Sequence, residues 1–319
     1  MKKLNSKTSL ILIIAVFVIV LCTVVVLVVR GYQDEKKWFD DYESAREYAL
    51  KAKKDIFLVF SGTSWDDVSI QLKHDIFDTE EFLVFICEHF VPVCLDIPLD
   101  DGQTEFTQQQ NRNLELSRIF AIPEVPTMLV MTGNNQIYET IPCTPGGTAL
   151  ADIQSAITEA YKKGQTIASL NDKLERVSGP DRVVIIDELV SMTPQDYIFQ
   201  FYNLINTVPE LDPQNQTGLV GKYTLIITHV SSLEKLFNGD AAGAAEVYAE
   251  AAQNPLFTPS EKLEAYYKAA TMCYYGGLND KLKEYLEKAI EADPESENAS
   301  ILRSTLDSFI AEEQDKAQK

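Results

Sequence analysis

The sequence predicts an α/β domain, a mixed sheet flanked by helices, followed by an all-helical domain and preceded by one transmembrane helix. Three observations support this organisation. An unbroken apolar run from Ile56 to Phe60 leads through a polar loop into a helix-spaced pattern, which is typical of a strand buried on both faces. After Gln165 no succession of strands is recognisable, whereas helical patterns continue. The residues from Leu10 to Val29 carry no charge.

Length and charge limit the function classes. A chain of 319 residues with 45% hydrophobic residues has room for two packed cores. We expect residues 1–30 to form a cytoplasmic tip and anchor, residues 31–163 the α/β domain and residues 164–319 the helical domain. The net charge of −20 argues against a nucleic-acid partner, because such partners need a cationic surface.

The apolar segment from Leu10 to Val29 has the length of a membrane span. At ~1.5 Å per residue it covers about 30 Å, the thickness of the hydrocarbon core of a bilayer. It is too long for a typical signal-peptide core, and no small-residue cleavage site follows it. Because Lys2, Lys3 and Lys7 precede it, we expect a cytoplasmic N-terminus and place the rest of the chain in the periplasm or another extracytoplasmic space. A buried helix of a soluble domain is the alternative.

The α/β domain is expected to begin with a helix from Trp38 to Lys54, ahead of the strand Ile56–Phe60. The loop of residues 61–64 then leads into the next helix. The helix-spaced residues after the loop are Trp65, Val68, Leu72 and Ile76. Next we expect a helix that is capped by residues 78–81 and ends near Phe90, and then the strand Phe90–Asp96. A polar insertion over 97–111 leads to the helix Arg112–Ile122 and the strand Met128–Thr132. A turn at 133–135 connects this strand to the strand Gln136–Pro142, and a closing helix runs from Thr148 to Lys163.

The stretch around this loop resembles the active-site segment of thioredoxin-fold proteins. It is closest to the extracytoplasmic branch, whose motif runs Phe-Ser/Thr-Gly-x-x-Trp-Cys-x-x-Cys. Residues 60–62 and Trp65 match, but Asp66 and Ser69 stand where the two cysteines would be. Dithiol chemistry needs a nucleophilic thiolate and a second thiol that resolves the mixed disulfide. The resemblance therefore implies the fold without the usual chemistry, and Asp66 and Asp67 are interpreted as first-turn residues that favour the helix.

A second segment resembles the other thioredoxin signature, a helix that ends in a Val-Pro-Thr step. In the family the proline is cis, packs beside the active cysteines, and the backbone before it pairs with bound peptide. The resemblance thus implies a cis bond between Val125 and Pro126, close to Asp66, while Glu124 stands where relatives often carry glycine. The implied peptide-binding candidates are Trp65, Val125, Pro126 and Thr127.

In the C-terminal half we expect helices over 167–177, 181–191 and 194–206, followed by two related helix pairs. One pair includes residues 239–251, and the other includes residues 266–294 with a glycine turn at Gly277. The second pair resembles a degenerate tetratricopeptide repeat, and in relatives such arrays bind peptides or subunits. A plain helical appendage is the alternative. Four aromatic residues could line a groove there, or belong to the core: Tyr266, Tyr267, Tyr274 and Tyr275.

The ionisable side chains form no recognisable metal site, and no cofactor is expected. The five cysteines show neither zinc-ligand nor disulfide-framework spacing. They are Cys22, Cys87, Cys94, Cys143 and Cys273. An acidic pair at Asp66 and Asp67, or Asp66 with His74, is a weaker candidate for catalysis or metal binding. Cys143 could lie near the motif because its loop follows the last strand.

Two functions remain open at this level. The first is a membrane-tethered, redox-inactive scaffold or chaperone-like protein that binds protein or peptide partners through the Val125–Pro126 loop and the helical domain. The second is a thiol-disulfide oxidoreductase that uses Cys143 or a cysteine of a partner. The missing Cys-x-x-Cys pair favours the first.

Overall fold

The computed structural model describes residues 37–99, 102, 105–141, 143 and 150–317. The segment Leu10–Val29 lies outside these residues. Among the described residues, every helix is too short or too polar to cross a bilayer. The chain separates into two compact units, Met1–Tyr161 and Lys162–Lys319, and each is described by itself.

The first unit is built on a mixed sheet of four strands. The strands are β1 (Asp55–Ser61), β2 (Phe90–Asp96), β3 (Thr127–Met131) and β4 (Ile137–Ile141), in the order β2-β1-β3-β4. β1 pairs parallel with β2 and antiparallel with β3, and β3 pairs antiparallel with β4. The residues from Ile56 to Phe60 are fully buried, which confirms the central strand that the apolar run predicts.

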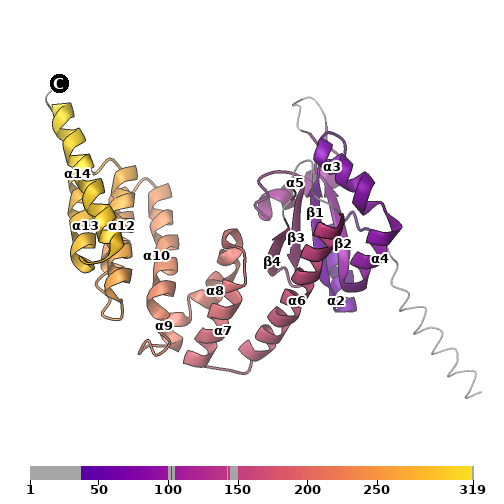
Figure 1. Ribbon diagram of the computed structural model, residues 1–319, viewed down its shortest axis with the longest axis horizontal. Helices are drawn as coiled ribbons and strands as arrows, with labels where there is room; N and C mark the ends of the chain where they lie inside the picture. Colours follow the sequence, from indigo (N-terminus) through magenta and orange to yellow (C-terminus); the bar gives the residue numbers. More distant parts are fainter. Residues whose placement is uncertain (1–36, 100–101, 103–104, 142, 144–149, 318–319) are drawn as a thin grey trace, which may run out of the picture. The chain divides into compact units, whose positions relative to one another are not determined.

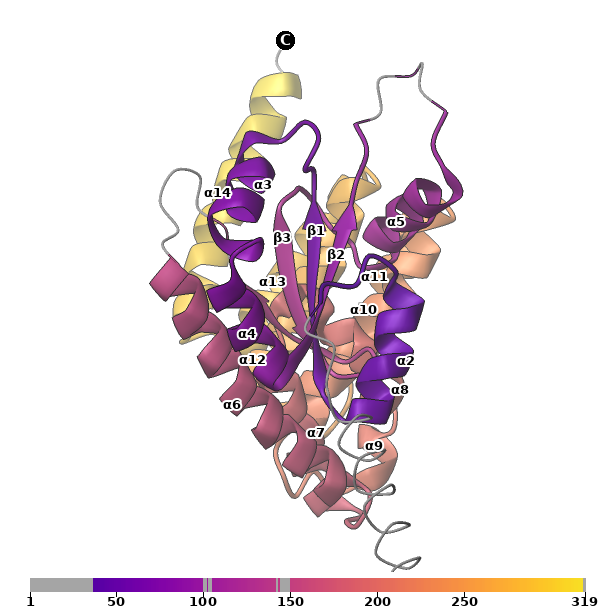
Figure 2. The ribbon, with the colours of Figure 1, turned by 90° about the vertical axis from the view of Figure 1, so that its right-hand side faces the viewer.

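Helices cover both faces of this sheet. α2 (Tyr42–Ala52) and α5 (Gln108–Ile119) lie on one side (Figure 2). On this side the rings of Tyr42 and Phe120 meet edge to face. On the other side lie α3 (Asp67–Leu72), a π-helical turn (Lys73–Phe77), α4 (Glu80–His89) and the first part of α6 (Leu150–Leu174). Thr79 caps α4 through its side chain, as the sequence predicts.

The chain before α2 differs from the prediction of a helix starting at Trp38. α2 begins only at Tyr42, because the Asp41 side chain accepts a hydrogen bond from the Ser44 N–H and caps the helix there. Phe39 instead forms a parallel bridge with β2, donating its N–H to the Pro92 carbonyl at 2.9 Å. This short segment therefore covers part of the outer edge of β2.

α5 and α6 also have different bounds from those expected. α5 starts four residues earlier, because Thr107 and Gln110 form a reciprocal capping box. It ends before Ala121, which has a positive φ of 50°. α6 continues through the expected break after Lys163 as far as Leu174.

A continuous apolar stripe explains the length of α6. Its buried residues recur at helical spacing on both sides of Gly164, which is itself buried. They include Ile153, Ile157, Ala160, Ile167, Leu170 and Leu174. A glycine inside a helix costs about 1 kcal/mol relative to alanine, and the buried side chains on either side offset that cost. The expected domain boundary at Lys163 thus falls inside a helix.

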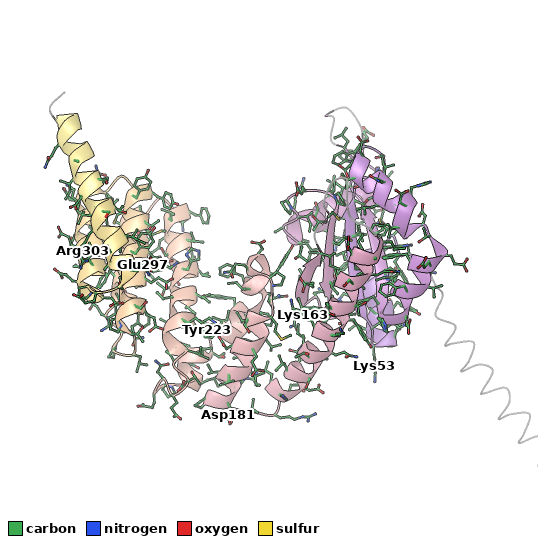
Figure 3. All side chains as sticks on the ribbon, in the orientation of Figure 1. Lys53, Lys163, Asp181, Tyr223, Glu297 and Arg303 are labelled. Carbon is green, nitrogen blue, oxygen red and sulfur yellow. The ribbon has the colours of Figure 1, made fainter. Side chains whose placement is uncertain are left out.

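The second unit is all-helical over its described residues (Figure 1). After α6 come α7 (Pro180–Ser191), a 3₁₀ helix (Gln195–Phe201), α8 (Tyr202–Ile205), α9 (Val208–Leu211), α10 (Val220–Phe237), α11 (Ala241–Ala251), α12 (Pro259–Tyr275), α13 (Asn279–Ala292) and α14 (Glu297–Ala317). From α10 to α14 each helix packs against the next in sequence. Tyr223 joins α10 to α7, because its hydroxyl donates to Asp187 at 2.8 Å (Figure 3).

Candidate functional site

The candidate site is the loop between β1 and α3, where the cysteine pair of the resembling family would stand. Asp66 ends the loop as the N-cap of α3, and its Oδ2 accepts a hydrogen bond from the Ser69 N–H at 2.7 Å. It therefore satisfies a helix N–H that would otherwise lack a partner. This agrees with the interpretation of Asp66 as a residue that initiates the helix.

Ser69 is buried beneath the loop and holds its backbone. Its side chain is only 1% exposed, and its Oγ accepts the Gly62 N–H at 3.0 Å. The backbone of the loop is folded tightly, since the Gly62 carbonyl accepts the Asp66 N–H at 2.8 Å. Both positions where cysteines would stand thus hold oxygen atoms that accept backbone N–H groups, Asp66 from the first turn of α3 and Ser69 from the loop.

Trp65 lies across the loop and fixes it to the end of β2. Its indole Nε1 donates to the Ile97 carbonyl at 2.7 Å, while 38% of the side chain remains exposed. A Cβ at Gly62 would lie 2.8 Å from the indole ring, so only glycine leaves room for the ring in this position. Trp65 therefore presents a partly exposed aromatic surface in a fixed orientation.

The end of β2 adds a connection that the sequence analysis missed. The Asp96 Oδ1 accepts hydrogen bonds from both the N–H and the hydroxyl of Thr63, each at 2.7 Å. From α5, Asn113 donates its side-chain amide to the Asp96 carbonyl at 2.9 Å. The available signal was a charged residue, Asp96, at the end of a buried strand, but its hydrogen-bond partners come from other elements.

The Val125–Pro126 peptide bond is cis, as the second signature predicts. Thr127 pairs with Phe60 where β3 meets β1, so the antiparallel register continues toward Pro126 beside the end of β1 and the start of the motif loop. The Thr127 hydroxyl donates to the Glu124 carbonyl at 2.7 Å and closes this second loop. Val125 and Pro126 are half-buried.

Cys143 lies close enough to Asp66 for their charges to interact. Burial, and to a smaller extent the negative charge of the Asp66 carboxylate, raise the pKa of the Cys143 thiol to about 11. Near pH 7 only about one such thiol in 10⁴ is ionised, whereas reactive cysteines have a lowered pKa. The electrostatics of this position therefore disfavour a thiolate nucleophile.

The other described cysteines have a similar character. Burial raises the pKa of Cys94 to about 12, and it also raises the pKa of Cys273. Cys87 is buried in α4. His74, weighed above as a partner of Asp66, instead places its Nδ1 2.6 Å from the Asp75 carboxylate. Within the described part of the chain, no group of three or more His, Cys, Asp and Glu side chains could hold a metal ion.

In the helical unit, the four tyrosines that could line a groove are not equivalent. The Tyr266 ring stacks on Tyr285, with the centroids 6.4 Å apart, so this residue belongs to the packing between α12 and α13. Tyr267, Tyr274 and Tyr275 are exposed. At the centre of the unit, Tyr248 is fully buried, and its hydroxyl lies 2.7 Å from the His229 Nδ1.

Two protein families match the chain, one in its N-terminal half and one in its C-terminal half. Residues 42–152 match the family described as a thioredoxin-like domain, and residues 219–315 match a family described as an uncharacterised protein C-terminal domain. The chain thus contains a thioredoxin-like domain followed by a helical C-terminal domain.

Three curated proteins are similar to parts of the chain. The thioredoxin-related protein DsbJ of Chlamydia pneumoniae is 27% identical over 99 residues, which are 31% of this chain and 28% of that protein. The disulfide bond reductase DsbH of the same organism is 26% identical over 121 residues, 37% of this chain and 72% of DsbH. An uncharacterized protein of Treponema pallidum (strain Nichols) is 18% identical over 210 residues, 64% of this chain and 69% of that protein.

The chain thus aligns with less than a third of the length of DsbJ. Among solved structures, the DsbH oxidoreductase is 24% identical and aligns over 38% of this chain and 83% of its own length, with a TM-score of 0.32. A thioredoxin from Thermus thermophilus is 16% identical over 40% of this chain and 88% of its own length, with a TM-score of 0.31.

Proposed function

We propose that the protein is a membrane-anchored, redox-inactive member of the thioredoxin-like group that binds segments of partner proteins as an extracytoplasmic scaffold or chaperone-like module. The observation that carries this proposal is the replacement of the dithiol by oxygen atoms that keep the loop in shape. Asp66 caps α3 and Ser69 accepts the Gly62 N–H, so the loop is held without either thiol. Neither residue can form the mixed disulfide that exchange requires.

The recognition surface would be the loops around Trp65 and Pro126. The indole is held by its hydrogen bond to the Ile97 carbonyl and is still partly exposed, so it can contact a ligand without losing much conformational freedom. The half-buried Val125 and Pro126 provide an apolar surface next to the end of β1. An extended peptide segment matches such a surface, with backbone and side-chain contacts.

A binding experiment tests this recognition surface. Peptides that bind the protein are selected from an array of extracytoplasmic sequences, and their affinity is then measured for two variants. Trp65→Ala should weaken binding by about 2 kcal/mol, roughly 30-fold, as aromatic anchors do. Ile70→Ala, which removes an exposed apolar side chain from α3, serves as the matched control and should change the affinity less than about twofold. Equal effects of both variants would reject the Trp65 surface.

The membrane anchor has its own test. The full chain should stay with membranes after alkaline extraction, and a reporter that is active only in the cytoplasm should be silent when fused after Lys319. Activity of that reporter would place the folded units in the cytoplasm and contradict the orientation. The lysines before the apolar segment support the proposed direction.

The second candidate function is a thiol-disulfide oxidoreductase that uses Cys143 or a partner's cysteine. Two observations favour it: Cys143 lies close to Asp66, the position of the first motif cysteine, and the chain is similar to a protein named disulfide bond reductase. The raised pKa of Cys143 weighs against it, because the thiolate is the reacting species. Reductase activity that disappears in Cys143→Ser would establish this second function.

A further inference from the structure

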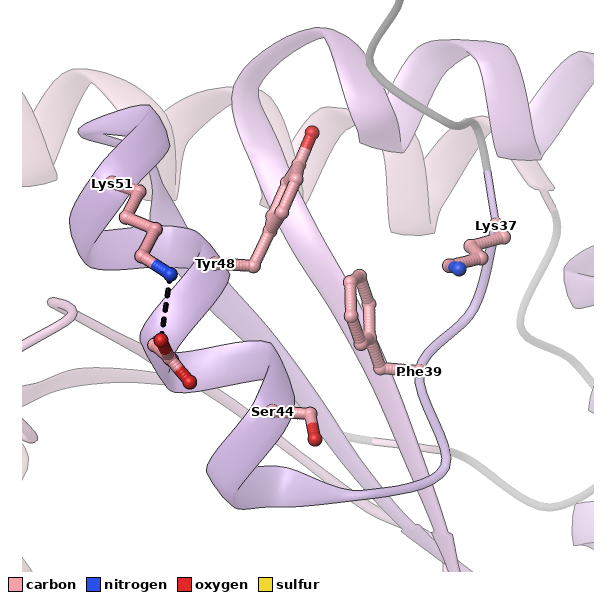
Figure 4. A pocket seen from close by; sticks show the side chains of 6 residues that line it. Lys37, Phe39, Ser44, Tyr48 and Lys51 are labelled. Atoms are coloured by element: carbon pink, nitrogen blue, oxygen red, sulfur yellow. Dashed lines mark hydrogen bonds and ion pairs between the residues drawn. The ribbon is translucent and has the colours of Figure 1, made fainter. Parts of the chain in front are cut away.

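A pocket with a volume of about 270 Å³ opens between α2 and the chain segment that precedes it (Figure 4). The residues that line it are Lys37, Phe39, Ser44, Glu47, Tyr48 and Lys51. The four that belong to α2 follow the spacing i, i+3, i+4, i+7 and so lie on one side of this helix. The rings of Phe39 and Tyr48, with centroids 5.4 Å apart, form an aromatic wall.

The charge around this pocket is positive. A narrower hollow shares Lys37 and both rings with the pocket and reaches Lys54, whose Nζ donates to the Cys87 carbonyl at 2.9 Å. Three lysines thus surround the two rings. Glu47 is the one carboxylate that lines either space among the described residues, and its Oε1 lies 2.6 Å from the Lys51 Nζ.

The sequence around the pocket differs in charge from the rest of the chain. Residues 30–54 contain seven Lys and Arg against six Asp and Glu, whereas the whole chain has a net charge of −20. Lys37 follows Val29, the end of the apolar segment, by only eight residues. Eight residues reach at most about 28 Å when fully extended. If the apolar segment spans a bilayer, the pocket is therefore within reach of its surface.

We propose that this pocket binds the phosphate group of an anionic phospholipid, so that α2 rests on the membrane surface. This inference rests on the membrane anchoring in the proposed function. Lysine binds phosphate as a point charge, and the aromatic rings suit the boundary between headgroups and acyl chains. Near an anionic membrane each lysine strengthens attraction about fivefold.

Binding at this pocket leaves the candidate site accessible. α2 and α3 lie on opposite sides of the sheet (Figure 2), so the membrane covers the helix that does not carry Asp66. The lipid contact would fix the orientation of the first unit relative to the bilayer through α2 and leave the Trp65 loop, at the end of β1, outside that contact.

A lipid titration of the full-length chain in nonionic detergent tests the proposal. Phosphatidylglycerol, phosphatidylcholine and sn-glycerol 3-phosphate are added separately, bound lipid is counted by native mass spectrometry, and each lysine is probed by amine labelling. Phosphatidylglycerol should bind, and labelling of Lys37 and Lys51 should fall at least about fivefold. Labelling of the exposed Lys235 in the helical unit should be unchanged.

Charge-removing variants locate the binding to the pocket. The double variant Lys37→Gln and Lys51→Gln should weaken phosphatidylglycerol binding by at least about 25-fold, because it removes two charge-assisted contacts to the phosphate. The matched control is Lys53→Gln, which removes the same charge two residues from Lys51 but does not line the pocket (Figure 3). It should change the affinity less than about twofold. Unchanged far-UV circular dichroism verifies that the variants are folded.

Each other outcome overturns the proposal. If phosphatidylcholine binds as tightly as phosphatidylglycerol, the net charge of the lipid plays no part in binding. If sn-glycerol 3-phosphate protects Lys37 and Lys51 from labelling as well as phosphatidylglycerol does, the ligand is a soluble phosphate and not a lipid. Equal weakening by Lys53→Gln would indicate diffuse attraction without a pocket. Failure of the anchor is distinguishable, because it appears in alkaline extraction of membranes, whereas this titration is done in detergent and depends only on the pocket.

Discussion

The motif loop of the thioredoxin-like unit and the interhelical turns of the second unit are stabilised in different ways. In the motif loop, polar atoms hold the chain: Ser69 accepts the Gly62 N–H, and Trp65 donates to the Ile97 carbonyl. In the second unit, the backbone of the turn after α12 packs closely against the start of α11. A Cβ at Gly276 would lie 2.4 Å from the Cβ of Ala241, the first residue of α11.

The two units are therefore expected to tolerate substitutions at different kinds of position. The motif loop is held without cysteines, because the oxygen atoms of Asp66 and Ser69 accept backbone N–H groups. The turns of the helical unit depend on small residues, yet tolerate large exposed rings beside them. Phe237, Tyr274 and Tyr275 are 83%, 65% and 66% exposed. The motif loop thus depends on side-chain hydrogen bonds, whereas the turn after α12 combines backbone hydrogen bonds with close packing against Ala241.

The largest expected effect concerns the turn after α12. Gly276→Ala should destabilise the helical unit by about 3 kcal/mol, because both methyl groups are attached directly to backbone and one backbone must shift. Gly277→Ala is the control: it has a φ of 65° and open space around it, so strain alone should cost about 1 kcal/mol. Denaturant unfolding followed by circular dichroism measures both. Equal effects would show that contact does not hold this turn.

A smaller effect is expected in the motif loop. Ser69→Ala leaves the buried Gly62 N–H without its acceptor, at a cost of about 2 kcal/mol. Ser64→Ala, on the exposed part of the same loop, should cost less than about 0.5 kcal/mol. Both tryptophans lie in the first unit, so tryptophan fluorescence reports its unfolding separately. A Ser69→Ala variant as stable as the wild type would remove the hydrogen-bond explanation.

The smallest expected effect concerns the pKa of the Cys143 thiol. With its pKa raised to about 11, alkylation of Cys143 should be slow at pH 7 and accelerate up to about tenfold per pH unit toward pH 11. Asp66→Asn keeps a helix cap but removes a negative charge that disfavours the thiolate. It should lower the pKa and speed alkylation at pH 8 by about two- to fourfold.

Mass spectrometry of the peptide that contains Cys143 measures this rate with iodoacetamide. Asp67→Asn is the matched control, since Asp67 is the adjacent exposed carboxylate and does not influence the pKa of Cys143. A rate that is already independent of pH at 7 would contradict the raised pKa and favour a reactive thiol.

The sequence predicted the elements whose signals are local and strong. The bounds predicted for the strand Phe90–Asp96 are confirmed, because its residues are almost all apolar and polar residues flank the apolar run. The cis bond at Pro126 followed from the resemblance of one short motif. Both predictions depend on neighbouring residues in the chain.

The features that escaped prediction depend on partners distant in sequence. Phe39 looked like part of a helix, but its backbone pairs with β2 more than fifty residues later. The break expected after Lys163 is absent because the buried stripe of α6 continues past Gly164. The role of Ser69 could not be predicted either, since its acceptor role is defined only when the loop brings Gly62 to it.

The central claim is that the thioredoxin-like unit retains the shape of a dithiol site without its chemistry. Insulin reduction by the wild-type chain and by the double variant Asp66→Cys, Ser69→Cys tests it most directly. The wild type should show no activity above background. The variant should gain it, because one thiol then lies at the start of α3, where the first-turn N–H groups lower its pKa, and the other one turn later. Strong wild-type activity that is lost in Cys143→Ser would contradict the claim.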